Sequence, residues 1–112
     1  MKAVHLSRKL VLEAATRVPD GAGGYTDTWA ALGTVWADVR AGYGREREGV
    51  AATISYVTYR IVVRSSPVGA VSRPKPDQRF REGMRVYQIV AVTEFDPGSL
   101  YLECFTKEEV SA

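Results

Sequence analysis

Apolar and polar positions alternate along residues 29–40, which is the clearest pattern in the chain. Every second position from Trp29 to Val39 carries an apolar residue or glycine. From residue 34 onward, the positions between them carry Thr34, Trp36, Asp38 and Arg40. Because successive side chains of a strand point to opposite faces, this pattern predicts a strand with one apolar face. Residues 19–24, with a proline, an Asp–Gly pair and two further glycines, predict the turn before it.

Five further segments have the patterns of shorter strands. Residues 53–65 and 84–94 are rich in β-branched and aromatic residues and alternate with a period of two. Residues 100–105 follow a proline–glycine turn and predict the last strand. Residues 8–18 predict an early strand, with a short helix as the alternative, and residues 78–82 predict a short edge strand.

These strands, joined by turns and without a long helical pattern, predict an all-β fold. We expect a small antiparallel β-barrel or sandwich of about five to seven strands with long loops, because closure protects the edges of a sheet. The 112 residues suit one domain, 1–112. The apolar faces of the strands predict a core that contains Trp29, Val35, Val57, Ile61, Ile89, Leu100 and Leu102.

Three segments lie outside this pattern. Residues 1–7 are expected to form a loose N-terminal arm, and the acidic residues 106–112 are expected to form a frayed tail. Residues 41–52 contain three glycines and an alternating Arg–Glu–Arg–Glu run. They predict a projecting loop, a kind of segment that often carries function on a small rigid domain. Helical turns over residues 45–52 are the alternative, because the charges would pair along them.

Positive and negative charges are unevenly distributed along the chain. The net charge is +2, but residues 40–85 hold ten basic and four acidic residues, whereas residues 86–112 hold one basic and five acidic. Such asymmetry is typical of a nucleic-acid surface or a charged protein interface. It also suits a head-to-tail oligomer, in which one edge of a subunit meets a different edge of the next.

The sequence has no spacing that is typical of an active site or a metal site. His5 is the only histidine and Cys104 is the only cysteine, so we expect neither a His-activated nucleophile nor a Cys/His ligand set. The glycines of residues 21–24 lack the Gly–Lys–Ser/Thr ending of a phosphate loop. We therefore expect no enzyme, no cofactor and no metal. No apolar run is long enough to span a bilayer, so we also expect no membrane partner.

Several short motifs occur in an order that resembles a known family. They are the turn at residues 20–24, Thr-Val-Trp-Ala-Asp-Val at 34–39, Tyr-Arg-Ile-Val-Val-Arg at 59–64, Gly-Met-Arg-Val-Tyr-Gln-Ile at 83–89 and Leu-Tyr-Leu-Glu-Cys at 100–104. Across residues 6–106 this order resembles the tailed-phage head–tail joining family, whose members are also called head-closure, stopper or head–tail adaptor proteins.

The resemblance implies a structural protein of the virion neck, assembled in the cytoplasm of a bacterial host. Copies of the chain would form a six- or twelvefold ring between a portal or adaptor ring and a tail terminator or tail protein. The ring would close the DNA-filled head, and double-stranded DNA would pass without sequence specificity. The particle would be a phage or a phage-like particle, such as a prophage product or a gene transfer agent. By its position, the 41–52 loop matches the family's long loop, and its contacts to the adaptor or the channel would come from Arg45, Glu46, Arg47 and Glu48.

A second hypothesis comes from the strand face that holds Tyr56, Arg60 and Arg64. Aromatic and cationic side chains on one face can stack on bases and pair with phosphates. This face is therefore a candidate surface of a small β-barrel that binds single-stranded nucleic acid. Binding of single-stranded DNA across a salt series would separate the two hypotheses.

Overall fold

The computed structural model describes residues 3–47 and 54–111, and all its regular elements are strands. The prediction of an all-β fold is confirmed. The six strands are β1 (Arg8–Pro19), β2 (Tyr25–Arg47), β3 (Ile54–Arg64), β4 (Arg79–Glu82), β5 (Arg85–Glu94) and β6 (Tyr101–Ser111).

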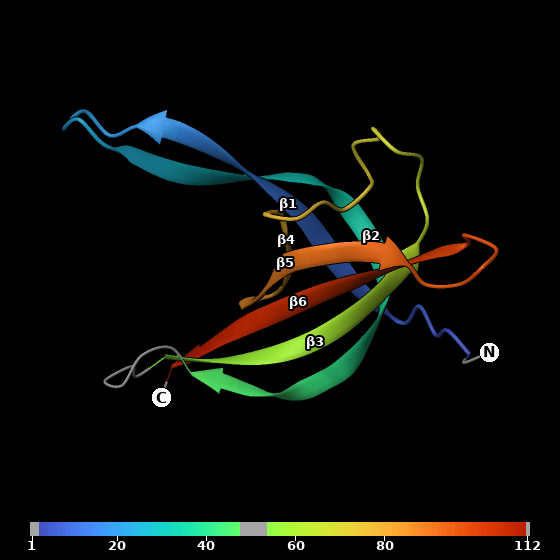
Figure 1. Ribbon diagram of the computed structural model, residues 1–112. Helices are drawn as coiled ribbons and strands as arrows, with labels where there is room; N and C mark the ends of the chain where they lie inside the picture. The colour runs from blue at the N-terminus through green and yellow to red at the C-terminus, as the bar shows by residue number, and fades with distance from the viewer. Residues whose placement is uncertain (1–2, 48–53, 112) are drawn as a thin grey trace.

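The strands pair antiparallel in the order β1-β2-β3-β6-β5-β4 and close into a barrel (Figure 1). The closure is made by β4, which pairs with β1 on one side and with β5 on the other. The predicted strand at residues 78–82 is therefore confirmed as β4, but the prediction that it lies at an edge is wrong. A strand of four residues at this position removes the two free edges that β1 and β5 would otherwise present.

The longest strand, β2, runs through the barrel and contributes to two hairpin-like projections beyond it. Its first half pairs with β1 and its second half pairs with β3, with the change at Ala37. Beyond the barrel, residues 14–30 of β1 and β2 form a two-stranded hairpin, which we call the arm. Residues 42–47, 54–58 and 107–111 of β2, β3 and β6 form the second projection, which we call the wing. Figure 1 shows both leaving the same end of the barrel, and the molecule extends over 49 × 33 × 23 Å.

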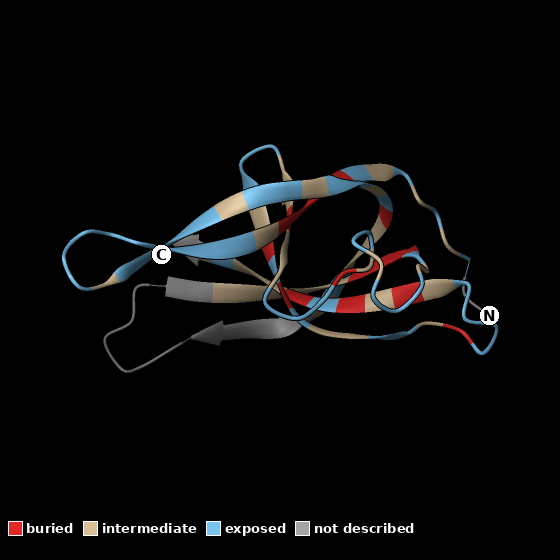
Figure 2. Ribbon diagram, turned by 90° about the horizontal axis from the view of Figure 1, so that it is seen from above, coloured by how far each residue is buried: buried red, intermediate tan, exposed pale blue. Residues whose placement is uncertain are grey.

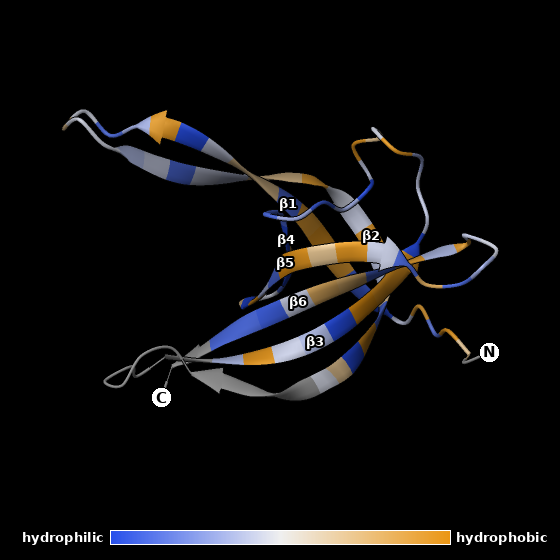
Figure 3. Cartoon of the chain, in the orientation of Figure 1, coloured by the Kyte–Doolittle hydropathy of each residue, from blue (hydrophilic) through white to orange (hydrophobic). Residues whose placement is uncertain are grey.

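The core fills the barrel and leaves the arm exposed (Figure 2). Its buried members are Leu10, Leu12, Ala37, Ile61, Val63, Phe80, Tyr87, Ile89, Leu102 and Cys104. The predictions for Ile61, Ile89 and Leu102 agree with this cluster, and half-buried Val35 packs against it. Figure 3 shows that β6 becomes hydrophilic toward the wing, where no core lies beneath it.

Trp29 is not in the core, because the period-two pattern is interrupted between the two halves of β2. Leu12 pairs with Gly33 and Glu13 pairs with Ala31, so a bulge leaves Leu32 without a partner. A bulge of one residue exchanges the two faces of a strand. Leu32 consequently packs against the core, whereas Trp29 lies half-buried at the base of the arm.

Two other residues of the predicted core also lie outside it. Leu100 is 62% exposed, because it belongs to the turn that precedes β6 and the strand alternation does not yet apply to it. Val57 is half-buried, and its ladder partners are Arg45 and Glu108 in the wing, beyond the buried cluster.

The predicted loop at 41–52 is wrong over its first half, since residues 41–47 continue β2 and pair with β3. A register shift between Ala41 and Arg45 absorbs the glycines within the strand. The predicted frayed tail is likewise wrong over residues 106–111, which pair with β3 as the end of β6. Residues 48–53 and 112 lie outside the described residues.

The N-terminal segment that the sequence predicts to be loose is instead hydrogen-bonded to β2 over residues 3–7. The backbone N–H of Ser7 donates to the carbonyl oxygen of Ala37 at 3.1 Å, and the N–H of His5 donates to Asp38 Oδ2 at 3.0 Å. Arg40 Nη2 donates to the carbonyl oxygen of Ala3 at 2.8 Å. These bonds anchor the segment along the outside of the barrel.

Gly42 is required by the close approach of β2 to β3. A Cβ at this position would lie 2.5 Å from the Thr58 hydroxyl and 2.7 Å from the Thr58 carbonyl oxygen. We expect Gly42→Ala to lower the free energy of unfolding by about 1–3 kcal/mol, because backbone must move to accommodate the methyl group. Urea unfolding measures the loss. Ala30→Ser, at an exposed position of the same strand, should change it by less than about 0.5 kcal/mol.

Candidate functional site

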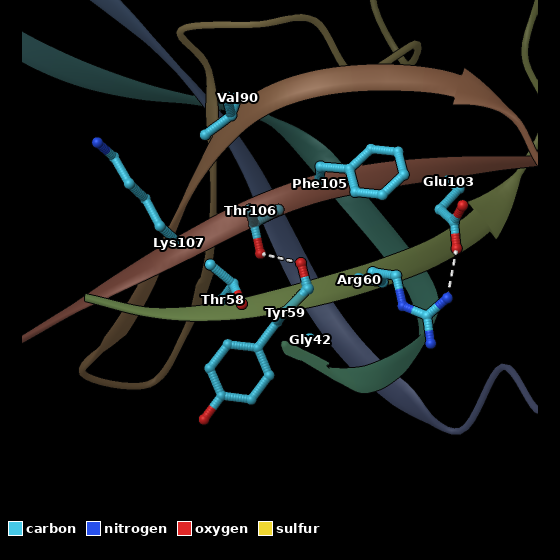
Figure 4. A pocket seen from close by; sticks show the side chains of 9 residues that line it. All are labelled: Gly42, Thr58, Tyr59, Arg60, Val90, Glu103, Phe105, Thr106 and Lys107. Atoms are coloured by element: carbon cyan, nitrogen blue, oxygen red, sulfur yellow. Dashed lines mark hydrogen bonds and ion pairs between the residues drawn. The ribbon is translucent and has the colours of Figure 1, made fainter. Parts of the chain in front are cut away.

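The outer surface of β3, β5 and β6 contains a hollow of about 470 Å³, which we call the groove (Figure 4). Val90 and Phe105 are its apolar side chains, and both are exposed. Thr106 contributes its hydroxyl from below, where it donates to the Tyr59 carbonyl oxygen at 3.1 Å. The remaining lining residues are Gly42, Thr58, Arg60, Glu103 and Lys107.

The groove exists because the strands that form it are irregular. In the ladder between β5 and β6, Ile89 pairs with Thr106 and Ala91 pairs with Phe105, so Val90 has no partner. A bulge of this kind redirects a side chain, and it leaves Val90 on the outer surface. The floor stays open at the β2 side because Gly42 has no side chain to fill it.

The charged groups at the rim of the groove are paired locally. Arg60 Nη1 lies 3.7 Å from Glu103 Oε2, and Lys107 Nζ lies 4.4 Å from the centre of the Tyr56 ring. Arg64 is exposed, and it is separated from Arg60 along β3 by fully buried Val62. The structure thus does not bring Tyr56, Arg60 and Arg64 together as one continuous cationic strip. The single-stranded nucleic-acid hypothesis gains no support from this arrangement, because such proteins track the backbone with a continuous basic groove.

A buried ion cluster joins the base of the arm to the barrel. Glu13 is 5% exposed and accepts hydrogen bonds from Arg79 Nε at 2.7 Å and Arg81 Nε at 2.8 Å. The Arg79 guanidinium lies 3.9 Å from the centre of the Trp29 ring. Burial raises the pKa of Glu13, but the hydrogen bonds from the two arginines outweigh it and hold the pKa below its ordinary value. Sequence reasoning missed this cluster, because Arg79 and Arg81 follow Glu13 by 66 and 68 residues in the sequence.

Two further ion pairs fasten the β4–β5 hairpin. Arg8 forms an ion pair with Glu82 and donates to the Tyr87 hydroxyl at 3.2 Å. Arg85 Nε donates to Glu108 Oε2 at 2.8 Å. The two ion pairs join neighbouring strands, and the Arg8–Tyr87 bond reaches across β4 from β1 to β5. These contacts stabilise the barrel.

The described residues offer no assembled catalytic or metal site. Burial raises the pKa of the Cys104 thiol to about 12, so it stays protonated at neutral pH. Across residues 3–47 and 54–111, no group of three His, Cys, Asp or Glu side chains could hold a metal ion. In the same part of the chain, no helix has the length and apolarity needed to cross a membrane.

Three of the four residues predicted for the projecting loop lie at the end of the wing. Arg45, Glu46 and Arg47 are the last residues of β2, where they pair with Val57, Tyr56 and Ser55 of β3. Glu48 lies outside the described residues. The structure therefore places the backbone of three of the four predicted loop residues at the far end of one projection.

A family model and two solved structures match all or nearly all of the chain. The family model for the phage head completion protein matches residues 1–109. A chain from the virion of a native gene transfer agent particle is 53% identical, with a TM-score of 0.84 and coverage of 100% of both chains. A Shigella flexneri 2a protein known from a solution structure shares the fold, with 21% identity, a TM-score of 0.64 and coverage of 96% of both chains. No curated protein matches the chain.

Proposed function

Since the chain belongs to the family of phage head completion proteins, we propose that it joins the DNA-filled head of a phage-like particle to its tail, as a structural protein of the neck. The observation that carries the proposal is the match over the full length, at 53% identity, to a chain of a gene transfer agent virion. The particle is accordingly a phage or a gene transfer agent, assembled in a bacterial cytoplasm. A structural role of this kind needs no catalytic site.

Within the neck, the chain forms a six- or twelvefold ring that lies between a portal or adaptor ring and a tail terminator or tail protein. Ring assembly needs two unlike surfaces on each subunit, since a heterologous contact closes by rotation. The molecule has such asymmetry, because the arm and the wing leave one end of the barrel while the N-terminal segment and two loops gather at the other (Figure 1). Double-stranded DNA passes the ring without sequence specificity, which agrees with a net charge of only +2.

Deletion of the gene tests the proposed function. Without the protein, the producing cells should contain filled or emptying heads and separate tails, and expression of the protein in trans should restore joined particles. Electron microscopy of the two preparations gives the ratio of joined to separate parts. Joined particles at the normal ratio in the deletion strain would contradict the proposal.

The end of the wing is the part of the subunit that contacts the adaptor or the channel. β2 ends there with Arg45, Glu46 and Arg47, and Glu48 follows in the sequence, which makes two cations and two anions in a row. We expect the double variant Arg45→Glu/Arg47→Glu to fold normally but to join heads and tails at least about tenfold less often, because reversed charges oppose a complementary partner surface.

The measurement is the yield of joined particles, with thermal unfolding of the isolated variant beside it. The matched control is Arg17→Glu, which reverses one exposed arginine on the arm. An unaltered particle yield for the wing variant would remove this role from the four residues.

A further inference from the structure

The arm projects from the barrel with almost no core of its own (Figure 1). Over residues 15–30 every residue is exposed except Gly24 and Trp29, which are half-buried. A two-stranded hairpin is at best marginally stable in water, and a third strand or a packed face is needed to hold it. The contact between Trp29 and Arg79 holds only the base of the arm. The outer part of the arm therefore needs a further strand from another chain.

Both long edges of the arm lack a neighbouring strand among the described residues. β4 pairs with β1 only over Val11–Glu13, and β3 pairs with β2 only beyond the arm. At the base of the arm, Ala15 shares a hollow with Asp77. We therefore define the β1 edge as residues 16–19 and the β2 edge as residues 25–30.

The hydrogen bonds of the hairpin determine which backbone groups point toward these edges. The N–H of Asp20 donates to the carbonyl oxygen of Gly24 at 3.1 Å. Successive antiparallel pairs alternate between pairs that exchange backbone bonds and pairs that do not. Counting back from the turn, Arg17 and Asp27 form a pair that does not. Their N–H and C=O groups consequently point outward, those of Arg17 to the β1 edge and those of Asp27 to the β2 edge.

The two edges carry opposite charges. Arg17 is the only charged residue of the β1 edge, and Asp27 is the only one of the β2 edge. Arg17 Nε lies 3.8 Å from Asp27 Oδ1, and the two side chains are 72% and 47% exposed. The β2 edge has neither a lysine nor a proline, the residues that commonly block the addition of a strand. It is therefore open to a strand that carries a positive charge.

These charges favour one pairing between the arms of two copies of this chain. Two β1 edges in symmetric contact would bring Arg17 near Arg17, and two β2 edges would bring Asp27 near Asp27. Like charges directly opposite each other in a sheet are destabilising. The β2 edge of one copy against the β1 edge of another instead places Asp27 opposite Arg17, as in the hairpin itself. Arginine and aspartate then alternate in a row across the strands.

The same pairing suits a ring. When neighbouring arms lie side by side and point the same way, β2 of one copy runs antiparallel to β1 of the next. In the register of the hairpin, Asp27 exchanges two backbone bonds with Arg17 of the next copy, and the N–H of Tyr25 donates to the carbonyl oxygen of Pro19, which makes about three bonds. The contact joins unlike edges, as closure of a ring requires.

We infer that the arms join neighbouring copies of this chain, with the β2 edge of one copy paired to the β1 edge of the next. The inference rests on the proposed ring in the neck and assigns one of its subunit contacts. The charges favour this pairing over the symmetric ones, and the backbone hydrogen bonds hold it. A single exposed ion pair contributes little, so a change at Arg17 alone should not prevent the joining of heads and tails.

Engineered cysteines test this contact in assembled particles. Val18→Cys and Thr26→Cys are made in separate copies of the chain, and both copies are expressed in the producing cells. In the inferred register these positions lie directly opposite each other between copies, in a pair that exchanges no backbone bonds, where side chains are closest. Mild oxidation should give a dimer of the chain that reduction reverses, and only when both variants are present. Native Cys104 is buried and does not compete.

Further combinations test the register. Thr16→Cys with Thr28→Cys should also give the dimer, because these positions are opposite in the same register. Val18→Cys with Thr28→Cys, which are offset by two residues, should give at least about fivefold less dimer. The control for random collision is Val68→Cys, at a position that is 87% exposed on the loop after β3. Together with Val18→Cys it should give no dimer.

The outcomes separate this inference from the proposed function. Dimers from either variant alone would show that like edges meet, and a cross-link to a different protein would show another occupant, so each would overturn the inference. Joined particles that contain both variants but give no dimer would overturn it as well. Joined particles that do not contain the chain at all would contradict the neck function itself. Circular dichroism of each variant establishes that the fold is kept.

Discussion

Replacing Phe80 with alanine should lower the free energy of unfolding by about 3–5 kcal/mol, which is the largest effect that we expect from a single substitution in this chain. The side chain of Phe80 is fully buried in the core. It lies on β4, whose four residues close the barrel, and it faces Leu12 on β1 and Tyr87 on β5. Truncation leaves a cavity at the place where the sheet meets itself. Because small domains are stable by only about 5–15 kcal/mol, much of the protein should be unfolded at moderate urea.

Urea unfolding followed by tryptophan fluorescence measures this loss, since half-buried Trp29 lies at the base of the arm and becomes solvated on unfolding. The control is Met84→Ala, two residues beyond β4, where the side chain is 99% exposed. It should unfold at the same urea concentration as the wild type. A Phe80→Ala variant with the same midpoint as this control would show that the barrel is closed by something other than the packing of β4.

Replacing Glu13 with alanine should cost about 2–3 kcal/mol of stability, because two arginines lose the carboxylate that pairs with both. We place the value below the usual cost of breaking a buried ion pair, since the Arg81 side chain is 40% exposed and is partly solvated. Arg79 should also lose its fixed position over Trp29, so the fluorescence of the folded state should change as well.

The pH dependence of stability gives an independent test of Glu13. Its pKa in the folded state is lower than the ordinary value of 4.5. The carboxylate therefore contributes stability that is fully present above the pKa of the unfolded state and is lost as the pH falls through the lower pKa of the folded state. The stability difference between wild type and Glu13→Gln should shrink below about pH 4.5. Glu109→Gln, at an exposed position, should follow the wild-type profile, and a constant difference between wild type and Glu13→Gln would contradict the assignment.

The strands could be predicted from the sequence wherever two regular neighbours pair with them. In β3, Tyr59, Ile61 and Val63 face the core as a period of two requires, although Val62 between them is also buried. The prediction failed at bulges, because a single inserted residue reverses every later side chain and leaves no strong local signal. Trp29 was therefore assigned to the core, although its arm lies beyond the bulge at Leu32.

The predicted loop at 41–52 was wrong over its first half for a different physical reason. Glycines and alternating charges over residues 41–47 are poor strand formers. These residues nevertheless continue β2, because they pair with β3, which pairs with β6 on its other side. The cluster of Glu13, Arg79 and Arg81 depends on contacts between segments far apart in sequence, which local patterns do not encode. In contrast, the position of Trp36 on the polar face of β2 could be read from the alternation, while a hollow beside it depends on the loop after β3.

The 23 residues of β2 run without a break from the tip of the arm to the tip of the wing. The arm and the wing are therefore joined by one strand, which β1 pairs with over one half and β3 over the other. Because this strand turns back between them, both projections leave the same end of the barrel (Figure 1). An insertion in β2 between the two would therefore shift one projection relative to the other.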